Sequence, residues 1–193
     1  MRNSQPAASG AAAHAGDQAL LQAVARHDPA AVRRLLDEVA PVVFGFVYAR
    51  VGGDEAAAED LLQETLLEAV RSAASFRGDA ALSSWLCAIA RRRLARFYES
   101  ERRAEAARAG LHLVRSPEEM ADDDEVERRD EVVRALGRIP VLHRQVLVLK
   151  YLDGRSVEEI AAELGRTRVQ VQSLLQRARD GLRRELGQEG DGG

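Results

Sequence analysis

Residues 156–186, SVEEIAAELGRTRVQVQSLLQRARDGLRREL, constrain the fold more than any other part of the sequence. Ser156 with Glu159, and Thr167 with Gln170, have the spacing of a capping box, in which a helix-capping side chain pairs with the third helical residue. Gly165 lies between the two boxes and suits the left-handed conformation that ends a helix. The pattern predicts two short helices joined by a tight turn, which is a helix-turn-helix.

The second predicted helix has an apolar side and a polar side. One buried stripe is expected at Val171, Leu175, Ala178 and Leu182. The opposite side carries arginine, glutamine and serine, which read base edges or hold phosphates in a major groove, and a valine able to touch a thymine methyl group. The outward residues are Arg168, Val169, Gln172, Ser173, Gln176, Arg177 and Arg179.

A plain helical hairpin with a solvated outer face is the alternative interpretation of this segment. Almost no acidic residue interrupts the outer face before Asp180, and Arg183 and Arg184 follow at positions that suit a phosphate backbone. Nucleic-acid binding is therefore the favoured interpretation.

The charge of the chain is arranged in blocks, although the net charge is only −3. Residues 54–68 hold six acidic residues and no basic one, whereas residues 71–108 hold nine arginines against four acids. Residues 115–131 hold nine acids against three arginines, and residues 134–186 hold eleven bases against six acids. Helices with merely solvated faces explain this alternation poorly, and the two basic blocks are the segments expected to meet nucleic acid.

Composition favours an all-helical protein. Hydrophobic residues make up 46% of the chain but aromatic residues only 4%, and Ala, Leu, Glu and Arg dominate. The single cysteine, Cys87, excludes an internal disulfide. No segment has the apolar run of a signal peptide or a membrane span, so we expect no membrane insertion and a cytoplasmic location.

The predicted architecture is two small helical domains joined by a flexible acidic linker, with the helix-turn-helix in the second domain. The expected parts are a disordered tail at 1–16, a first domain at 17–104, the linker at 105–131, a second domain at 132–186 and a tail at 187–193. Helix breaks are expected near Pro29 and Pro41. Asp79 is expected to cap the helix that follows it.

The helix predicted after Gly52-Gly53-Asp54 presents an acidic face. Asp60, Gln63 and Glu64 are spaced i, i+3 and i+4, so they share one side of the helix, and this side favours a basic partner. In the next predicted helix Arg93 falls inside the apolar arc. Either its side chain snorkels outward or the helix changes phase there.

Four runs of the sequence resemble the compact extracytoplasmic-function group of the sigma-70 family of bacterial transcription initiation factors. They are AAAEDLLQETLLEAV, FRGDAALSSWLCAIARRRLARF, LGRIPVLHRQVLVLKYLDGRSVEEIAAELG and LLQRARDGLRREL. They occur in the family's order and at its separations, and the resemblance spans about residues 17–186. Agreement with the family pattern in two separated domains indicates the family more specifically than an acidic helix or a helix-turn-helix alone would.

The resemblance implies a protein that binds RNA polymerase core and directs promoter-specific initiation. The first domain would bind core and melt the −10 element, and the second would bind the −35 element. In the family the acidic helix contacts the clamp helices of the largest polymerase subunit, so the candidate core contacts are Asp60, Gln63 and Glu64. The candidate −10 contacts are Arg77, Trp85, Arg91, Arg92 and Arg96. The candidate −35 contacts are Arg166, Thr167, Arg168, Val169, Gln170, Gln172, Ser173, Gln176, Arg177 and Arg179. For Trp85 the interpretation as a core side chain is favoured over a DNA contact.

The sequence departs from the family pattern in both DNA-binding segments. Family members often carry Asn and Asp at the positions of Arg92 and Arg96, and an apolar residue at Arg93, so this copy is more basic than usual. In the recognition helix the usual Thr-Val-Lys-Ser-Arg-Leu is replaced by QVQSLL at 170–175, which removes two positive charges. We therefore expect altered or weaker −35 recognition, and Gln170 is open to a role in DNA contact or in helix capping.

Other function classes explain less of the sequence. A helix-turn-helix regulator that binds an operator without polymerase accounts for residues 140–186 but leaves the acidic helix without a role. A helical interaction module predicts no salt-sensitive DNA binding. An enzyme is not expected, because the sequence has no metal-ligand cluster, Gly-rich phosphate loop or nucleophile motif, and no cofactor or metal is expected either. The resemblance adds an anti-sigma factor to the expected partners.

Overall fold

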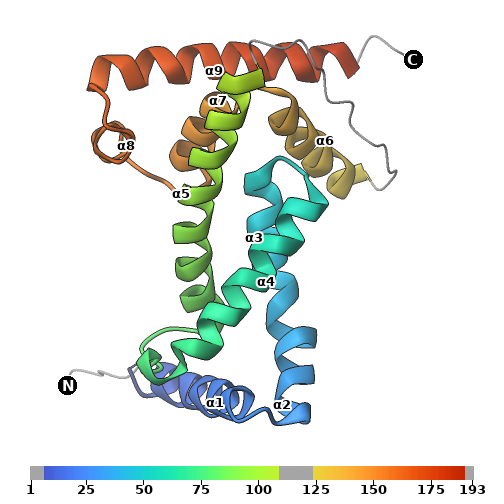
Figure 1. Cartoon of the computed structure of the whole chain (residues 1–193), viewed down its shortest axis with the longest axis vertical. Coiled ribbons are helices and arrows are strands. Elements are labelled where there is room, and N and C mark those ends of the chain that lie inside the picture. Colours follow the sequence, from blue (N-terminus) through green and yellow to red (C-terminus); the bar gives the residue numbers. More distant parts are fainter. Residues whose placement is uncertain (1–6, 109–123, 190–193) are drawn as a thin grey trace, which may run out of the picture. The chain divides into compact units, whose positions relative to one another are not determined.

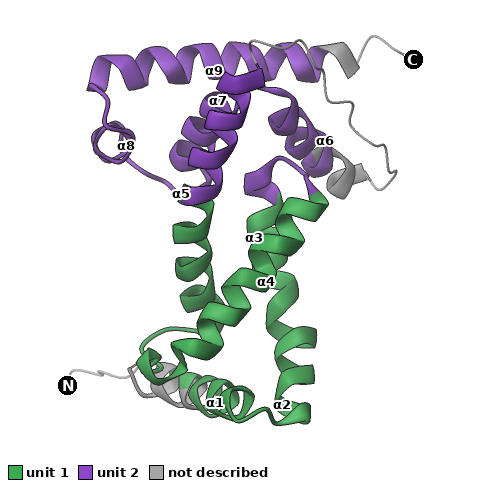
Figure 2. Ribbon diagram, in the orientation of Figure 1, with its two compact units in different colours: residues 1–48, 55–95 green, residues 49–54, 96–193 purple. Residues whose placement is uncertain are grey.

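The computed structural model describes residues 7–108 and 124–189 (Figure 1). The described residues form helices and connecting turns without a β-strand, which confirms the all-helical prediction. Two compact units divide the chain: unit 1 comprises residues 1–48 and 55–95, and unit 2 comprises residues 49–54 and 96–193 (Figure 2). The division differs from the predicted domain boundaries, since it runs through two continuous helices, α3 (Ala40–Val51) and α5 (Leu82–Arg108).

Unit 1 is built from the N-terminal helices. Its elements are α1 (Ala7–Ala25), α2 (Pro29–Arg34), the π-helical turn η1 (Leu35–Val39), the first part of α3 (Ala40–Val51), α4 (Glu55–Arg71), the 3-10 turn η2 (Ala73–Ser75) and the first part of α5 (Leu82–Arg108). α1 packs against α2, α4 and η2. The largest fully buried side chains of this unit include Leu21, Leu86 and Ile89.

The chain becomes helical earlier than the sequence analysis expects. α1 begins at Ala7 rather than near Asp17, so the prediction of a disordered tail is wrong for residues 7–16. Alanine has the highest intrinsic helix propensity, and residues 7–15 are rich in it. Of the remaining predicted tail residues, 1–6 and 190–193 lie outside the described part of the chain, whereas 187–189 belong to the last helix.

Pro41 does not break a helix, contrary to the prediction. α2, η1 and α3 follow one another without interruption, and the π-helical turn comes just before the proline. In this turn the N–H of Ala40 bonds to the carbonyl of Leu35, five residues back. The wider turn leaves room for the proline ring, which in an α-helix clashes with the carbonyl four residues earlier.

Two aspartates cap helices of unit 1. The break predicted near Pro29 is present, and the carboxylate of Asp28 accepts hydrogen bonds from two backbone N–H groups of α2, both at 2.9 Å. The prediction that Asp79 caps α5 is wrong. The backbone N–H of Leu82, the first residue of α5, donates instead to the carboxylate of Asp17 in α1 at 2.8 Å. The cap of α5 therefore comes from a distant helix, which local spacing cannot indicate.

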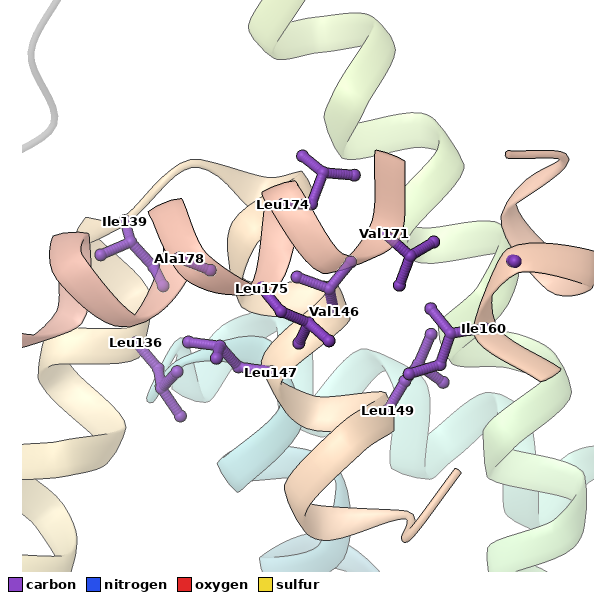
Figure 3. Packing of buried hydrophobic residues seen from close by; sticks show 11 residues of the cluster. Leu136, Ile139, Val146, Leu147, Leu149, Ile160, Val171, Leu174, Leu175 and Ala178 are labelled. Carbon is purple, nitrogen blue, oxygen red and sulfur yellow. The ribbon is translucent and has the colours of Figure 1, made fainter. Parts of the chain in front are cut away.

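Unit 2 combines the ends of α3 and α5 with the C-terminal helices. These are α6 (Asp124–Arg138), α7 (Val141–Leu147), the π-helical turn η3 (Val148–Leu152), α8 (Val157–Leu164) and α9 (Arg168–Glu189). α9 packs against α6, α7 and α8, and Figure 3 shows the apolar core where these helices meet. The predicted stripe on α9 is confirmed, because Val171, Leu175 and Ala178 are buried and Leu182 is partly buried against them.

The segment predicted as a linker is partly helical. α5 continues to Arg108 and α6 begins at Asp124, so both helices extend into residues 105–131. Residues 109–123 lie outside the described part of the chain. Among the described helices none is long and apolar enough to span a membrane.

Candidate nucleic-acid interface

The helix-turn-helix begins with the first predicted capping box. The Ser156 hydroxyl accepts a hydrogen bond from the N–H of Glu159 at 3.1 Å, and the Glu159 carboxylate accepts one from the N–H of Ser156 at 2.8 Å. The hydrogen bond from the Ser156 backbone lowers the pKa of Glu159 below its ordinary value. α8 then ends at Gly165, whose φ of 62° is the left-handed conformation that favours glycine.

The second predicted capping box is also present and uses Gln170. The side-chain carbonyl of Gln170 accepts a hydrogen bond from the N–H of Thr167 at 2.8 Å, and the Thr167 hydroxyl accepts one from the N–H of Gln170 at 3.2 Å. Two roles were open for Gln170, DNA contact and helix capping, and in the structure its side chain caps the helix. The box caps the start of α9.

The outer face of α9 carries the predicted side chains. All candidate −35 residues are exposed except Arg179, which is half-buried. Arg166 and Thr167 lie in the turn before α9, and the others lie along the helix. Val169 is 73% exposed, which is unusual for an apolar side chain on a helix that packs against three others. An exposed valine among polar side chains suits contact with a thymine methyl group.

Several polar side chains of this face are already held by neighbours. The Arg168 guanidinium lies 3.1 Å from the Glu158 carboxylate of α8. Arg179 donates to the side-chain carbonyl of Gln176 at 2.7 Å and to the Tyr151 hydroxyl at 3.3 Å. Gln176 in turn donates to the carboxylate of Asp180. Glu158 of α8 and Tyr151 of η3 lie on other elements, so the spacing of residues along α9 does not indicate these two contacts.

One histidine beside the helix-turn-helix has a perturbed pKa. Burial lowers the pKa of His143 on α7, and the positive charge of Arg177 on α9 lowers it further. The imidazole is therefore neutral near pH 7 and adds no positive charge to this side of the unit.

The acidic face on α4 is present as predicted. Asp60, Gln63 and Glu64 are exposed, whereas the opposite side of the helix buries Leu61 and Thr65. The Thr65 hydroxyl donates to the carbonyl of Leu61 at 2.6 Å, so this buried polar group is satisfied within the helix. All three side chains face solvent, where a basic partner can reach them.

Arg93 bridges α5 to the acidic helix. Its guanidinium lies 3.1 Å from the Glu64 carboxylate and 3.2 Å from that of Glu68. The side chain is 22% exposed, so it reaches out of the apolar arc toward the two acids, and the snorkelling interpretation is confirmed. Because Glu64 and Glu68 are spaced i, i+4, the arginine relieves their mutual repulsion. The anomaly of a charged residue in an apolar arc was the sequence signal for this contact.

The candidate −10 residues lie in and after the turn that leads into α5. Arg77 is exposed in the turn, and Arg91, Arg92 and Arg96 are exposed on the helix. The guanidinium of Arg91 stacks over the ring of Phe46 at 5.0 Å. Arg92 and Arg96 are one turn apart on a continuous helix and form one basic edge.

Trp85 packs inside unit 1. Its ring lies 5.1 Å from the ring of Phe76, and the tryptophan is half-buried. The packing favours the core interpretation over a DNA contact. Among the described residues no group of three His, Cys, Asp or Glu side chains could hold a metal ion.

These features define a helix-turn-helix protein that carries an acidic helix face in a second unit. Two family models match the chain: Sigma-70 region 2 over residues 35–104, and Sigma-70, region 4 over residues 129–181. The ECF RNA polymerase sigma factor BldN of Streptomyces coelicolor is 32% identical over 157 residues, which cover 75% of this chain and 56% of BldN. The ECF RNA polymerase sigma-E factor of Salmonella typhimurium is 31% identical over 183 residues, which cover 86% of this chain and 92% of that protein.

Among solved structures, the sigma factor RpoE in complex with the anti-sigma factor NepR from Bartonella quintana is 25% identical, with a TM-score of 0.45. The match covers 80% of this chain and 95% of that one. The chain belongs to the extracytoplasmic-function (ECF) group of the sigma-70 family. The acidic face and the basic edge of α5 fall inside the region 2 match, and α8 and all candidate −35 residues fall inside the region 4 match.

Proposed function

We propose that the chain is an RNA polymerase sigma factor, which binds core polymerase and directs promoter-specific transcription initiation. The proposal rests on two surfaces of opposite charge in one chain, the acidic face of α4 and the arginine-rich outer face of α9. The first lies within the region 2 match and the second within the region 4 match. The acidic face of α4 suits a basic protein partner, and the outer face of α9 suits the major groove.

Core binding is assigned to Asp60, Gln63 and Glu64. Carboxylates that project from one helix face attract a basic partner at long range, and the side-chain amide adds a directional hydrogen bond. The proposed partner surface is the clamp helices of the largest polymerase subunit. Family resemblance supports this choice of partner, and the exposure of all three side chains is consistent with it.

DNA binding is assigned to two basic surfaces. Four arginines are proposed to hold the −10 strand, namely Arg77, Arg91, Arg92 and Arg96. Trp85 is assigned a structural role through its packing against Phe76. On α9 we assign direct readout of the −35 element to Val169, Gln172 and Ser173, because their exposed positions share one side of the helix. The phosphate contacts are assigned to Arg166, Thr167, Arg168, Arg177 and Arg179. Gln176 is assigned to orient Arg179, and Gln170 to cap the helix.

The proposal needs no catalytic site, because the chemistry of transcription belongs to the polymerase. Core polymerase and promoter DNA are the main partners, and the chain would act in the cytoplasm, where these are found. An anti-sigma factor is a further proposed partner, which the resemblance to sigma factors supports.

The test is complex formation with purified RNA polymerase core, measured by gel filtration. We expect the wild-type chain to co-elute with core, and the variant Asp60→Arg with Glu64→Arg to elute alone. The single variant Asp60→Arg leaves the Arg93–Glu64 ion pair intact and should weaken binding without altering α4.

A matched control is Glu55→Arg with Glu59→Arg. These acids have the same i, i+4 spacing on α4 and give the same change of charge, but their mean direction lies about 140° around the helix from that of Asp60 and Glu64, the two residues changed in the test variant. The control should co-elute with core. Equal loss in both double variants would indicate a general charge effect, and failure of the folded wild type to bind core would favour the operator-binding regulator.

A further inference from the structure

The centre of the outer face of α9 carries no charge over the first two turns of the helix. Gln172 and Ser173 follow Val169 by three and four residues, so at about 100° per residue they lie about 60° and about 40° to either side of it. All three side chains are exposed. We call Val169, Gln172 and Ser173 the reading strip.

Arginines line both edges of the reading strip. By the same helical geometry, Arg168 and Arg179 lie about 100° and about 80° to one side of Val169, and Arg177 lies about 80° to the other side. A helix seated in a major groove directs its centre at base edges and its flanks at the phosphates of the two strands. The arginines therefore face phosphates, whereas the base edges meet the uncharged side chains of the reading strip.

Contacts with other elements hold two of these arginines at the sides of the helix. The Arg168 guanidinium lies 3.1 Å from the carboxylate of Glu158 in α8. Arg179 donates to the hydroxyl of Tyr151 in η3 at 3.3 Å. An arginine reads guanine by directing two N–H groups at one base edge, so each of these side chains would first have to leave its partner.

The reading strip ends where the next polar side chains of the face bond to one another. The Gln176 amide donates to the carboxylate of Asp180 at 3.2 Å, and its carbonyl accepts from Arg179 at 2.7 Å. Asp180 is acidic and lies on the same side of α9, where it disfavours a further DNA contact. By contrast, the Gln172 amide has no hydrogen-bond partner within the described residues, so both of its polar atoms can bond to a base.

The chemistry of the reading strip fits adenine and thymine. A glutamine amide pairs with N6 and N7 of adenine through two hydrogen bonds, and an apolar side chain contacts the C5 methyl group of thymine. A serine hydroxyl bonds to any base and adds no preference. Val169 and Gln172 are separated by about 4.5 Å along the helix, which is close to the base-pair step of about 3.4 Å, so they reach neighbouring base pairs.

We propose that the reading strip selects a −35 element with two neighbouring A·T base pairs, in which Gln172 bonds to an adenine and Val169 contacts a thymine methyl group. The inference rests on the proposed sigma function and names the bases that this function leaves open. The arginines at the edges set the affinity and its salt dependence, whereas the reading strip sets the sequence.

The test uses DNA in which single atoms or groups of the base edges are removed. A promoter is first selected from a random-sequence duplex pool by core polymerase together with the wild-type chain. Deoxyuridine then replaces each thymine of the selected −35 element in turn, which removes only the methyl group. In a second series 7-deazaadenine replaces each adenine, which removes only the N7 acceptor. The affinity of the holoenzyme for each duplex is measured at one fixed salt concentration.

Each analogue should be sensed by one side chain. We expect deoxyuridine at one position to weaken binding by the wild type about threefold and to leave binding by Val169→Ala unchanged. We expect 7-deazaadenine at a neighbouring pair to weaken the wild type about fivefold and to leave Gln172→Ala unchanged. The matched controls Val132→Ala, at a valine of α6 that is 39% exposed, and Gln170→Ala, at the capping glutamine, should keep the sensitivity of the wild type to both analogues.

A further variant tests Gln172 by a change of preference. Arginine pairs with O6 and N7 of guanine, so selection repeated with Gln172→Arg should replace the adenine by guanine at the same base pair. The thymine contacted by Val169 should stay unchanged. Because residue 172 is exposed, the substitution leaves the apolar core intact.

Two results would overturn the inference. One is a selected −35 motif without neighbouring A·T pairs, and the other is analogue effects that persist in full in Val169→Ala and Gln172→Ala. A wild type that binds no core polymerase would instead overturn the proposed function. The same titrations, made with the chain alone on DNA that it selects, would then still decide whether the reading strip contacts these bases.

Discussion

Two neighbouring glutamines on α9 have different environments. Gln170 closes a capping box with Thr167, whereas the Gln172 amide makes no hydrogen bond within the described residues and projects from the outer face. Sequence spacing predicted the capping box because both partners lie within four residues of each other. The positions of residues along α9 did not indicate that the Gln176 amide donates a hydrogen bond to Asp180, since an exposed glutamine without such a bond would occupy the same position.

We expect the substitutions Gln170→Ala and Gln172→Ala to affect different properties. The first removes half of a capping box and should lower the free energy of unfolding by about 1 kcal/mol. The second should leave stability unchanged and alter the preferred −35 sequence. Urea unfolding measures the former, and selection of random DNA by the holoenzyme measures the latter. Equal effects of both changes on the selected sequence would assign Gln170 to DNA readout instead.

Arg93 predicts a salt-dependent contribution to stability. Arg93→Met keeps most of the apolar stem but leaves Glu64 and Glu68 as like charges one turn apart. Because the carboxylates are substantially exposed, the loss should be about 1 kcal/mol or less at low salt, and smaller still in 0.5 M NaCl. Arg92→Met, at the exposed neighbouring position, should change stability little. A loss that salt does not reduce would argue that Arg93 acts through packing and not through charge.

At the scale of single elements, the sequence predicted those helix ends whose caps are local. Both capping boxes, the left-handed glycine and the break near Pro29 are present because each depends on residues within one turn. The cap of α5 was not predicted, because Asp17 lies 65 residues from Leu82. The continuation of the helix through Pro41 was not predicted, because the spacing of apolar residues does not reveal a π-helical turn.

The capping box of α8 predicts a pH dependence with a definite sign. The pKa of Glu159 is lowered in the folded chain from its ordinary value of 4.5, so the ionised carboxylate contributes stability above that pH. The contribution is lost as the pH falls below 4.5 and through the lower folded value. The difference in unfolding free energy between wild type and Glu159→Gln should therefore be larger at pH 7 than at pH 3. A difference that stays constant between these values would contradict the role of the charge.

At the scale of the whole molecule, the helical class, the helix-turn-helix and the family could be predicted from sequence, but the division into units could not. Charge blocks and linker composition indicated a boundary near residue 105. The actual division follows contacts such as Arg50 with Asp153 and Arg144 with Val51, which join residues about 100 positions apart. Nothing in the local pattern around Arg50 distinguishes it from a solvated arginine.

The proposed function is that the chain gives core polymerase its promoter specificity. The most direct measurement is in vitro transcription from genomic DNA of the source organism, with start sites mapped for core alone and for core with the chain. We predict starts that appear only with the chain and share a −35 and a −10 motif, and that disappear with Asp60→Arg and Glu64→Arg. Starts identical to those of core alone, together with tight sequence-specific binding of DNA by the chain without polymerase, would contradict the account.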